Sequence, residues 1–247
     1  SAVETDRRKR VETQLLRWGG MPALLRLEDT RKQEWLKSYE ATYLERDLGD
    51  LARLTDLQPF RKVQRLAALR SGCLLSYSEL SRDAGVSVET VRRYLEYLRL
   101  SYQACEIQPY SRNLTSRLVK SPKLYWTDMG VLRAVAGLGD ALTGELFENY
   151  VVMEIVKYLK TIGLGQEPFF YRTRSGMEID LLIEGEAGVL GIEIKQSEKI
   201  GRSDFSALIS VGASLGSRWR GGLVVYRGNE IKKLEEAYKT LKDSGKA

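Results

Sequence analysis

Two short apolar runs in the C-terminal part of the sequence carry charged residues at spacings that allow them to act together. The runs are Met177–Ile183, which contains Asp180, and Leu190–Lys195, which contains Glu193 and Lys195. Successive side chains of an extended strand point to opposite faces, so Glu193 and Lys195 are expected to share one face. If Asp180 lies level with them on a neighbouring strand, two carboxylates converge beside one ammonium group.

Two carboxylates suit a hard divalent cation such as Mg²⁺, and a nearby lysine can orient or deprotonate an attacking water. This combination favours hydrolysis of a phosphodiester. The same spacing is also common on the charged face of an edge strand or in a structural ion pair, and taken alone it favours that structural interpretation. The sequence contains no histidine, which excludes Ser-His-Asp and Cys-His catalysis and histidine-ligated metals. Its two cysteines, Cys73 and Cys105, argue against a disulfide framework or a four-ligand zinc site.

The composition is that of a soluble globular protein with one or two domains. The 247 residues are 43% hydrophobic and 29% charged, and only 5 are proline. The sequence has no apolar run long enough for a membrane span and no signal peptide, so we expect a cytoplasmic protein without a membrane partner.

Positive charge is concentrated in the middle of the chain. Residues 57–127 contain 12 basic and 5 acidic side chains, whereas residues 1–56 contain 11 of each and residues 128–247 contain 16 and 17. A compact basic segment is typical of proteins that bind a phosphate backbone, and DNA is the expected partner. A basic surface without any partner is the alternative.

The basic segment has the pattern of a helix-turn-helix. Ser76 followed by Glu79 fits a capping box at the start of a helix that ends near Gly85, and Ser87 then caps a helix over residues 88–100. That helix has one apolar face, formed by Val88, Val91, Leu95 and Leu98. Arg92 and Arg93 lie on its other face, where a DNA-reading helix contacts its target.

A basic hairpin is expected to follow as a wing. Residues 101–108 and 124–126 have strand character, and the polar segment between them has basic residues and no acidic ones: Arg112, Arg117, Lys120 and Lys123. With Arg92 and Arg93, these residues are our candidate DNA contacts. Both elements are also consistent with surfaces that pack on protein.

The remaining regions differ in their expected architecture. Residues 1–56 are mostly helical, with breaks at Gly19-Gly20-Met21-Pro22. From residue 143 onwards the order is helix, three strands, helix, strand and terminal helix, which predicts a mixed sheet flanked by helices. Arg172 and Arg174 precede the turn before the Asp180 strand. They either bind a phosphate group or are exposed residues of a hairpin without a binding role.

The order of a helix with Glu148, then Asp180, then Glu193-Ile194-Lys195 resembles the PD-(D/E)XK nuclease superfamily, which includes archaeal Holliday junction resolvases. The resemblance implies that Glu148, Asp180, Glu193 and Lys195 are catalytic. It also implies a metal ion, Mg²⁺ or Mn²⁺, bound by Asp180, Glu193 and the backbone carbonyl of Ile194. The sequence departs from the family pattern at the position before Asp180, where isoleucine replaces proline.

A longer set of motifs resembles the C-terminal half of prokaryotic AAA-type ATPases: Trp35–Tyr39, Tyr43–Leu48, Leu118–Asp128 and Gly144–Asn149. In that family an ATPase domain precedes a winged helix and a nuclease-like domain. The resemblance implies an upstream ATPase domain that binds ATP, whereas this sequence has no G-x-x-x-x-G-K-[ST] loop and is not expected to hydrolyse ATP itself.

We therefore expect a mixed α/β protein in three parts: a helical segment over residues 1–56 from the ATPase lid or linker, a winged helix-turn-helix over residues 57–127, and a restriction-endonuclease-like α/β/α domain over residues 128–247. The expected function is a DNA-binding region with a metal-dependent DNA nuclease site. Two alternatives remain: a catalytically idle nuclease fold that binds DNA or protein, and a purely protein-facing regulatory or oligomerisation element. A homo-oligomer is a possible assembly of the protein.

Overall fold

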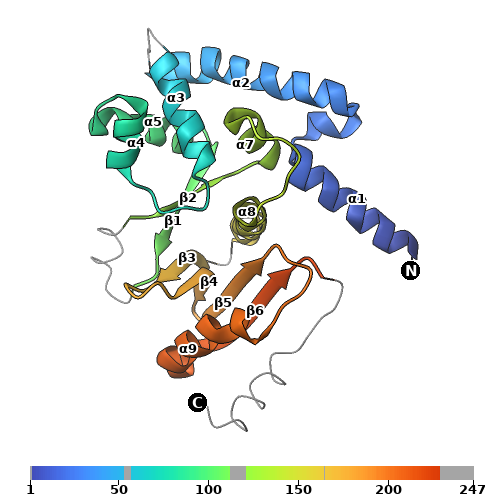
Figure 1. The fold of residues 1–247 in the computed structure, drawn as a ribbon, viewed down its shortest axis with the longest axis vertical. Coiled ribbons are helices and arrows are strands. Elements are labelled where there is room, and N and C mark those ends of the chain that lie inside the picture. The colour runs from blue at the N-terminus through green and yellow to red at the C-terminus, as the bar shows by residue number, and fades with distance from the viewer. Residues whose placement is uncertain (1, 53–56, 112–120, 164, 229–247) are drawn as a thin grey trace. The chain divides into compact units, whose positions relative to one another are not determined.

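The computed structural model of the chain describes residues 2–52, 57–111, 121–163 and 165–228 (Figure 1). These residues form a mixed α/β protein, which confirms the expected fold class, with eight α-helices and six strands in the order β2-β1-β3-β4-β5-β6. The chain divides into two compact units: residues 1–107 with 121–153, and residues 108–120 with 154–247. The expected boundaries at 56/57 and 127/128 stay predictions. No helix within the described ranges is long and apolar enough to cross a membrane.

The first unit begins with α1 (Ala2–Trp18), a short 3₁₀ turn (Pro22–Arg26) and α2 (Asp29–Ala52). The predicted break at the glycine pair separates α1 from the turn. Gly19 has a φ of +78°, and a Cβ there would collide with the carboxylate of Asp128. Glycine is therefore required at this position by both its backbone conformation and the close approach of a carboxylate.

The helix-turn-helix is formed by α4 (Tyr77–Ala84) and α5 (Val88–Leu100), which follow α3 (Gln58–Leu69). Ser76 Oγ accepts the Glu79 N–H at 3.4 Å, and Ser87 Oγ accepts the Thr90 N–H at 3.2 Å. Gly85 ends α4 with a φ of +74°. The predicted helix starts and the predicted turn are confirmed.

Strands β1 (Ala104–Pro109) and β2 (Lys123–Trp126) pair antiparallel after α5. A helix that the sequence analysis did not predict, α7 (Met129–Ala136), comes next. Asp128 caps it by accepting the Val131 N–H at 3.0 Å, and Asp128 also accepts the Gly20 N–H at 2.7 Å. One carboxylate therefore ties the start of α7 to the end of α1.

A buried asparagine links three segments of the first unit. Asn149 lies on α8 (Gly144–Ile162) and has no exposed surface. Its Oδ1 accepts hydrogen bonds from Ser71 Oγ at 2.6 Å and from the Trp126 N–H at 2.7 Å, and its Nδ2 donates to the Trp126 carbonyl at 3.0 Å. These bonds fix the start of α8 against β2 because buried polar groups are costly to leave unpaired.

The second unit contains β3 (Glu167–Arg172), β4 (Glu178–Gly185), β5 (Gly188–Lys195), α9 (Ser206–Leu215) and β6 (Trp219–Tyr226). Antiparallel pairs join β3 to β4 and β4 to β5, whereas β6 runs parallel to β5. Leu208 and Val211 of α9 pack into a buried cluster with residues of this sheet. The strands predicted in this region are confirmed, and the predicted helix from Glu230 lies outside the described residues.

Candidate functional site

Strands β4 and β5 bring Asp180, Glu193 and Lys195 together. The alternation of residues predicted the shared face of Glu193 and Lys195, whereas the position of Asp180 was left open. Their paired register ends with Leu181 opposite Ile192, and Asp180 and Glu193 are the next residues on the two strands. Asp180 Oδ2 accepts the backbone N–H of Ile194 at 2.7 Å. The aspartate of one strand is thereby held against the Glu-x-Lys segment of the other.

Glu193 and Lys195 form an ion pair on this face of the sheet. Lys195 Nζ donates to Glu193 Oε1 at 2.8 Å, and the side chains of Lys195 and Glu193 are 33% and 11% exposed respectively. The other carboxylate oxygen, Glu193 Oε2, is buried, and no donor among the described residues forms a hydrogen bond with it, although the Asp180 backbone N–H acts to lower the pKa of the Glu193 carboxyl. A buried carboxylate oxygen without a donor requires a physical explanation, and a bound cation is one such explanation.

The protonation states of this pair follow from burial and charge. Burial raises the pKa of the Glu193 carboxyl, although the neighbouring Lys195 ammonium acts in the opposite direction. Burial acts to lower the pKa of Lys195, but the carboxylates of Glu193 and Asp180 more than offset it, so the pKa is raised. Lys195 is therefore a cation at neutral pH, and of its two predicted roles this favours orienting a water over deprotonating it.

The fourth residue of the expected set, Glu148, belongs to the first unit. There its Oε1 accepts hydrogen bonds from Lys123 Nζ at 3.0 Å and from the Tyr125 hydroxyl at 2.6 Å. Lys123 is only 3% exposed. This buried ion pair gives Lys123 a structural role in place of the expected contact with a phosphate, because its ammonium is withdrawn from solvent.

The other expected DNA contacts are distributed over both units. Arg92 and Arg93 are exposed on α5, as predicted, and their guanidinium groups lie over the rings of Tyr77 and Tyr94 at 4.1 Å and 5.7 Å. Arg172 pairs with Glu178 at 3.0 Å across β3 and β4, and Arg174 is exposed in the turn between those strands. The described residues do not include Arg112, Arg117 and Lys120.

The metal-binding capacity of the site rests on two carboxylates. No cluster of three or more acidic, cysteine or histidine side chains able to hold a metal occurs within the described ranges. The side-chain oxygen donors are those of Asp180 and Glu193 Oε2, and the Ile194 carbonyl is the third donor that the nuclease resemblance implies. Mg²⁺ commonly uses one or two protein carboxylates and keeps several waters, so this donor set fits it.

Two residues that interact with members of the expected catalytic set were not anticipated from the sequence. The carboxylate of Asp204 contributes to raising the pKa of Lys195. Tyr125 holds Glu148 in the first unit. Neither could be found from a motif, because Asp204 approaches Lys195 only when the segment before α9 folds back, and Tyr125 meets Glu148 only through the packing of β2 and α8.

Two family models divide the chain between them. Residues 10–142 match a domain of unknown function, DUF8612, and residues 143–242 match another domain of unknown function, DUF4143. The first match takes in more than half of the chain. The chain belongs to the DUF8612 family. The boundary between the DUF8612 and DUF4143 matches lies at the start of α8, so the DUF4143 part carries Glu148, Asp180, Glu193 and Lys195.

Mycobacterial relatives extend well beyond the matched region. The uncharacterized proteins Rv2008c of Mycobacterium tuberculosis and Mb2031c of Mycobacterium bovis are each 30% identical to this chain over 205 residues. The alignment covers 79% of this chain and 46% of each relative, so the chain spans about half of their length. The crystal structure of protein VC1899 from Vibrio cholerae aligns with 92% of this chain and 52% of its own, at 15% identity and a TM-score of 0.28, which is too low to indicate a shared fold.

Proposed function

We propose that the second unit is a divalent-cation-dependent phosphodiesterase acting on DNA, and that the helix-turn-helix of the first unit binds the DNA. The observation that carries this proposal is the buried, unpaired Oε2 of Glu193 beside Asp180 and a protonated Lys195. A carboxylate oxygen in that position is able to accept a cation, and the second carboxylate and the lysine beside it supply the other groups that the reaction needs.

Asp180 and Glu193 would hold a divalent cation, which when bound would supply Lewis-acid chemistry for hydrolysis of a phosphodiester. The protein's own groups perform the remaining tasks. Glu193 and Asp180 supply negative charge at the ends of neighbouring strands, and the Ile194 N–H orients the Asp180 carboxylate. Lys195, as a cation, orients a water and offsets the negative charge of a phosphate in the transition state.

Contact with DNA is supported by the exposed arginines of α5. Arg92 and Arg93 each lie over an aromatic ring, which restrains the guanidinium while leaving N–H groups to donate to phosphate oxygens. They belong to the segment with 12 basic and 5 acidic side chains. This charge excess favours a polyanionic partner.

The motifs shared with AAA-type ATPases support a further proposal about the whole protein. We infer that this chain acts as part of a larger ATPase, in which a separate domain binds ATP and positions the DNA-facing units. The match to only 46% of the mycobacterial relatives is consistent with such an arrangement. As part of this proposal, we infer that the larger ATPase is cytoplasmic and forms homo-oligomers.

A second candidate function is a catalytically idle nuclease fold that retains DNA or protein. The hydrogen bonds that Lys123 and Tyr125 donate to Glu148 favour it, because they engage the carboxylate that the nuclease resemblance assigns to the metal site. Under this alternative the chain binds DNA without cutting it.

Cleavage of supercoiled and four-way-junction DNA with Mn²⁺ or with EDTA separates the two functions. The nuclease proposal predicts Mn²⁺-dependent cutting that is lost in Lys195→Ala. Glu198→Gln is the matched control, because Glu198 is exposed in the same unit and contributes no donor to the site. Retention of DNA without cutting by the wild-type chain, repeated with the full-length ATPase, contradicts the proposal and supports the idle fold.

Binding of Mn²⁺ tests the cation site without relying on activity. Asp180→Ala is expected to abolish Mn²⁺ binding in calorimetry while leaving the circular dichroism spectrum unchanged, because the carboxylate is a donor of the site and Asp180 is not fully buried. Unchanged Mn²⁺ affinity in this variant means that the cation, if bound, lies elsewhere.

A further inference from the structure

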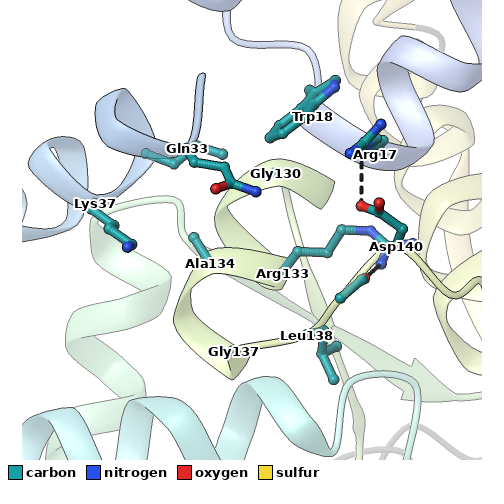
Figure 2. A pocket seen from close by; sticks show the side chains of 12 residues that line it. Arg17, Trp18, Gln33, Lys37, Gly130, Arg133, Ala134, Gly137, Leu138 and Asp140 are labelled. Atoms are coloured by element: carbon teal, nitrogen blue, oxygen red, sulfur yellow. Dashed lines mark hydrogen bonds and ion pairs between the residues drawn. The ribbon is translucent and has the colours of Figure 1, made fainter. Parts of the chain in front are cut away.

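A cavity of about 250 Å³ lies within the first unit, far along the sequence from the Asp180 strands (Figure 2). The end of α1, one face of α2, α7 and the loop after α7 form its walls. In Figure 2, Gln33 and Lys37 of α2 lie across the hollow from Ala134, and the ion pair of Arg17 with Asp140 lies at its other end. Its volume approaches the lower end of the range for small-molecule sites.

Part of the cavity wall is apolar. Trp18 and Leu36 are 6% and 4% exposed, and Ala134 and Leu138 complete the apolar lining. The Arg17 guanidinium lies 4.7 Å from the centroid of the Trp18 ring, which fixes the position of both side chains. Such a wall accepts the body of a planar or aliphatic ligand.

Positive charge predominates among the lining side chains. Arg17, Lys37 and Arg133 are basic, and Asp140 is the only acidic residue of the lining. Arg17 Nε lies 2.9 Å from Asp140 Oδ1, so that carboxylate is already engaged. Lys37 is exposed at the cavity, and the described part of the chain offers it no carboxylate within ion-pair distance.

Arg133 is a second basic residue of the lining, and it is largely buried. The residue is only 7% exposed, and its guanidinium donates to backbone carbonyls: Nε to Leu16 at 2.9 Å, and Nη1 to Ala141 at 3.1 Å and to Gly139. No carboxylate among the described residues forms an ion pair with it. Burial accordingly lowers the pKa of Arg133 from its ordinary value. Asp140 partly opposes this effect and Arg17 adds to it, so the group of Arg17, Arg133 and Asp140 carries a net positive charge that an anion in the cavity would offset.

We propose that this cavity binds a small organic oxyanion, a carboxylate or a phosphomonoester, with its charged group near Lys37 and Arg133 and its body against Trp18. The apolar wall selects for a ligand with a planar or aliphatic part, and the excess of cations selects for negative charge. The site is independent of the proposed nuclease function.

Isothermal titration of the wild-type chain with phenyl phosphate, benzoate and benzyl alcohol tests the proposal. Saturable binding of one or both anions and no binding of the neutral alcohol are expected. Binding of phenyl phosphate without binding of benzoate assigns the site to phosphomonoesters. Binding of benzoate without binding of phenyl phosphate assigns it to carboxylates. Absence of saturable binding by both anions overturns the proposal.

Two variants locate the site. Lys37→Gln is expected to weaken anion binding about tenfold, because it removes a charge-assisted contact, whereas Lys62→Gln, an exposed lysine of α3 outside the lining, is expected to leave it unchanged. Ala134→Phe fills the cavity and is expected to abolish binding. Binding that is unchanged in both Lys37→Gln and Ala134→Phe places the anion elsewhere and contradicts the assignment.

Discussion

At the scale of single residues, local environment decides what each charged side chain can do. Lys195 and Lys123 are both lysines paired with a glutamate. Lys195 keeps a third of its side chain exposed at the end of β5, whereas Lys123 is almost fully buried. Only the first is therefore positioned to meet a substrate. The two glutamates differ in the same way. Glu193 Oε2 accepts no hydrogen bond from the described residues, whereas Glu148 Oε1 accepts one from the Tyr125 hydroxyl.

Glu106 on β1 provides a prediction about pH. Burial raises the pKa of its carboxyl, although Arg99 opposes the shift, and its Oε1 is buried without a hydrogen bond. The folded state then binds the proton more tightly than the unfolded state. The stability due to this group is fully present below the unfolded pKa, about 4.5, and is lost as pH rises through the raised folded value.

Glu106→Gln removes this pH dependence. In urea denaturation between pH 4 and pH 8, the stability of the variant relative to wild type is expected to improve as pH rises. Glu96→Gln is the control, because Glu96 also pairs with Arg99, at 3.0 Å, but is 46% exposed. A constant difference between Glu106→Gln and wild type across this pH range contradicts the assignment.

At the scale of elements, short signals in the chain set where helices begin and end. Ser76 and Ser87 cap α4 and α5 at the predicted positions, and Gly85 provides the left-handed residue between them. α7 was missed although it has the same signals, with Asp128 at its start and Gly137 at a φ of +71° at its end. Its apolar run of only eight residues was too short to be recognised by periodicity.

Gly85→Ala tests the turn between the two DNA-facing helices. No atom lies within 4 Å of the position that a Cβ would occupy at Gly85, so the expected cost comes from the backbone conformation alone. That cost is about 1 kcal/mol in the free energy of unfolding. Gly144→Ala is the control, since that position also has open space and lacks a positive φ. Equal stability of the two variants in chemical denaturation contradicts the argument.

The arginines of α5 give a prediction about DNA binding. Arg92→Glu with Arg93→Glu is expected to weaken duplex binding and to reduce the slope of log affinity against log salt by about 2, because two phosphate contacts are lost. Fluorescence anisotropy at several salt concentrations measures both quantities. Arg26→Glu with Arg31→Glu changes the net charge equally at exposed positions away from α5. Equal losses in the two double variants show a non-specific charge effect and move the contact away from α5.

At the scale of the whole molecule, interactions between segments that are distant in the sequence hold the first unit together. Asn149 joins Ser71 and Trp126, which precede it by 78 and 23 residues, through buried hydrogen bonds. Asp128 similarly joins α7 to Gly20, which lies 108 residues earlier. Such contacts make the first unit cooperative although its segments are scattered along the chain.

Asn149→Leu is expected to destabilise the chain by about 2–4 kcal/mol, because it leaves the Ser71 hydroxyl and the Trp126 backbone groups buried without their partner. Urea denaturation monitored by tryptophan fluorescence measures the loss. Thr161→Val on the same helix removes only an exposed hydroxyl that bonds to the Lys157 carbonyl, and it is expected to be nearly neutral. A loss under about 1 kcal/mol for Asn149→Leu contradicts a central role for this residue.

The sequence by itself determined the fold class, the caps of α4 and α5, the strands β3 to β6 and the shared face of Glu193 and Lys195. These features follow from residue periodicity and capping, which act over a few neighbouring residues. Only the tertiary structure decided that Lys123 is buried against Glu148, that Lys195 forms an ion pair with Glu193, and that Arg17, Lys37 and Arg133 line one cavity. Burial and charge depend on which distant segments meet, and no local pattern carries that information.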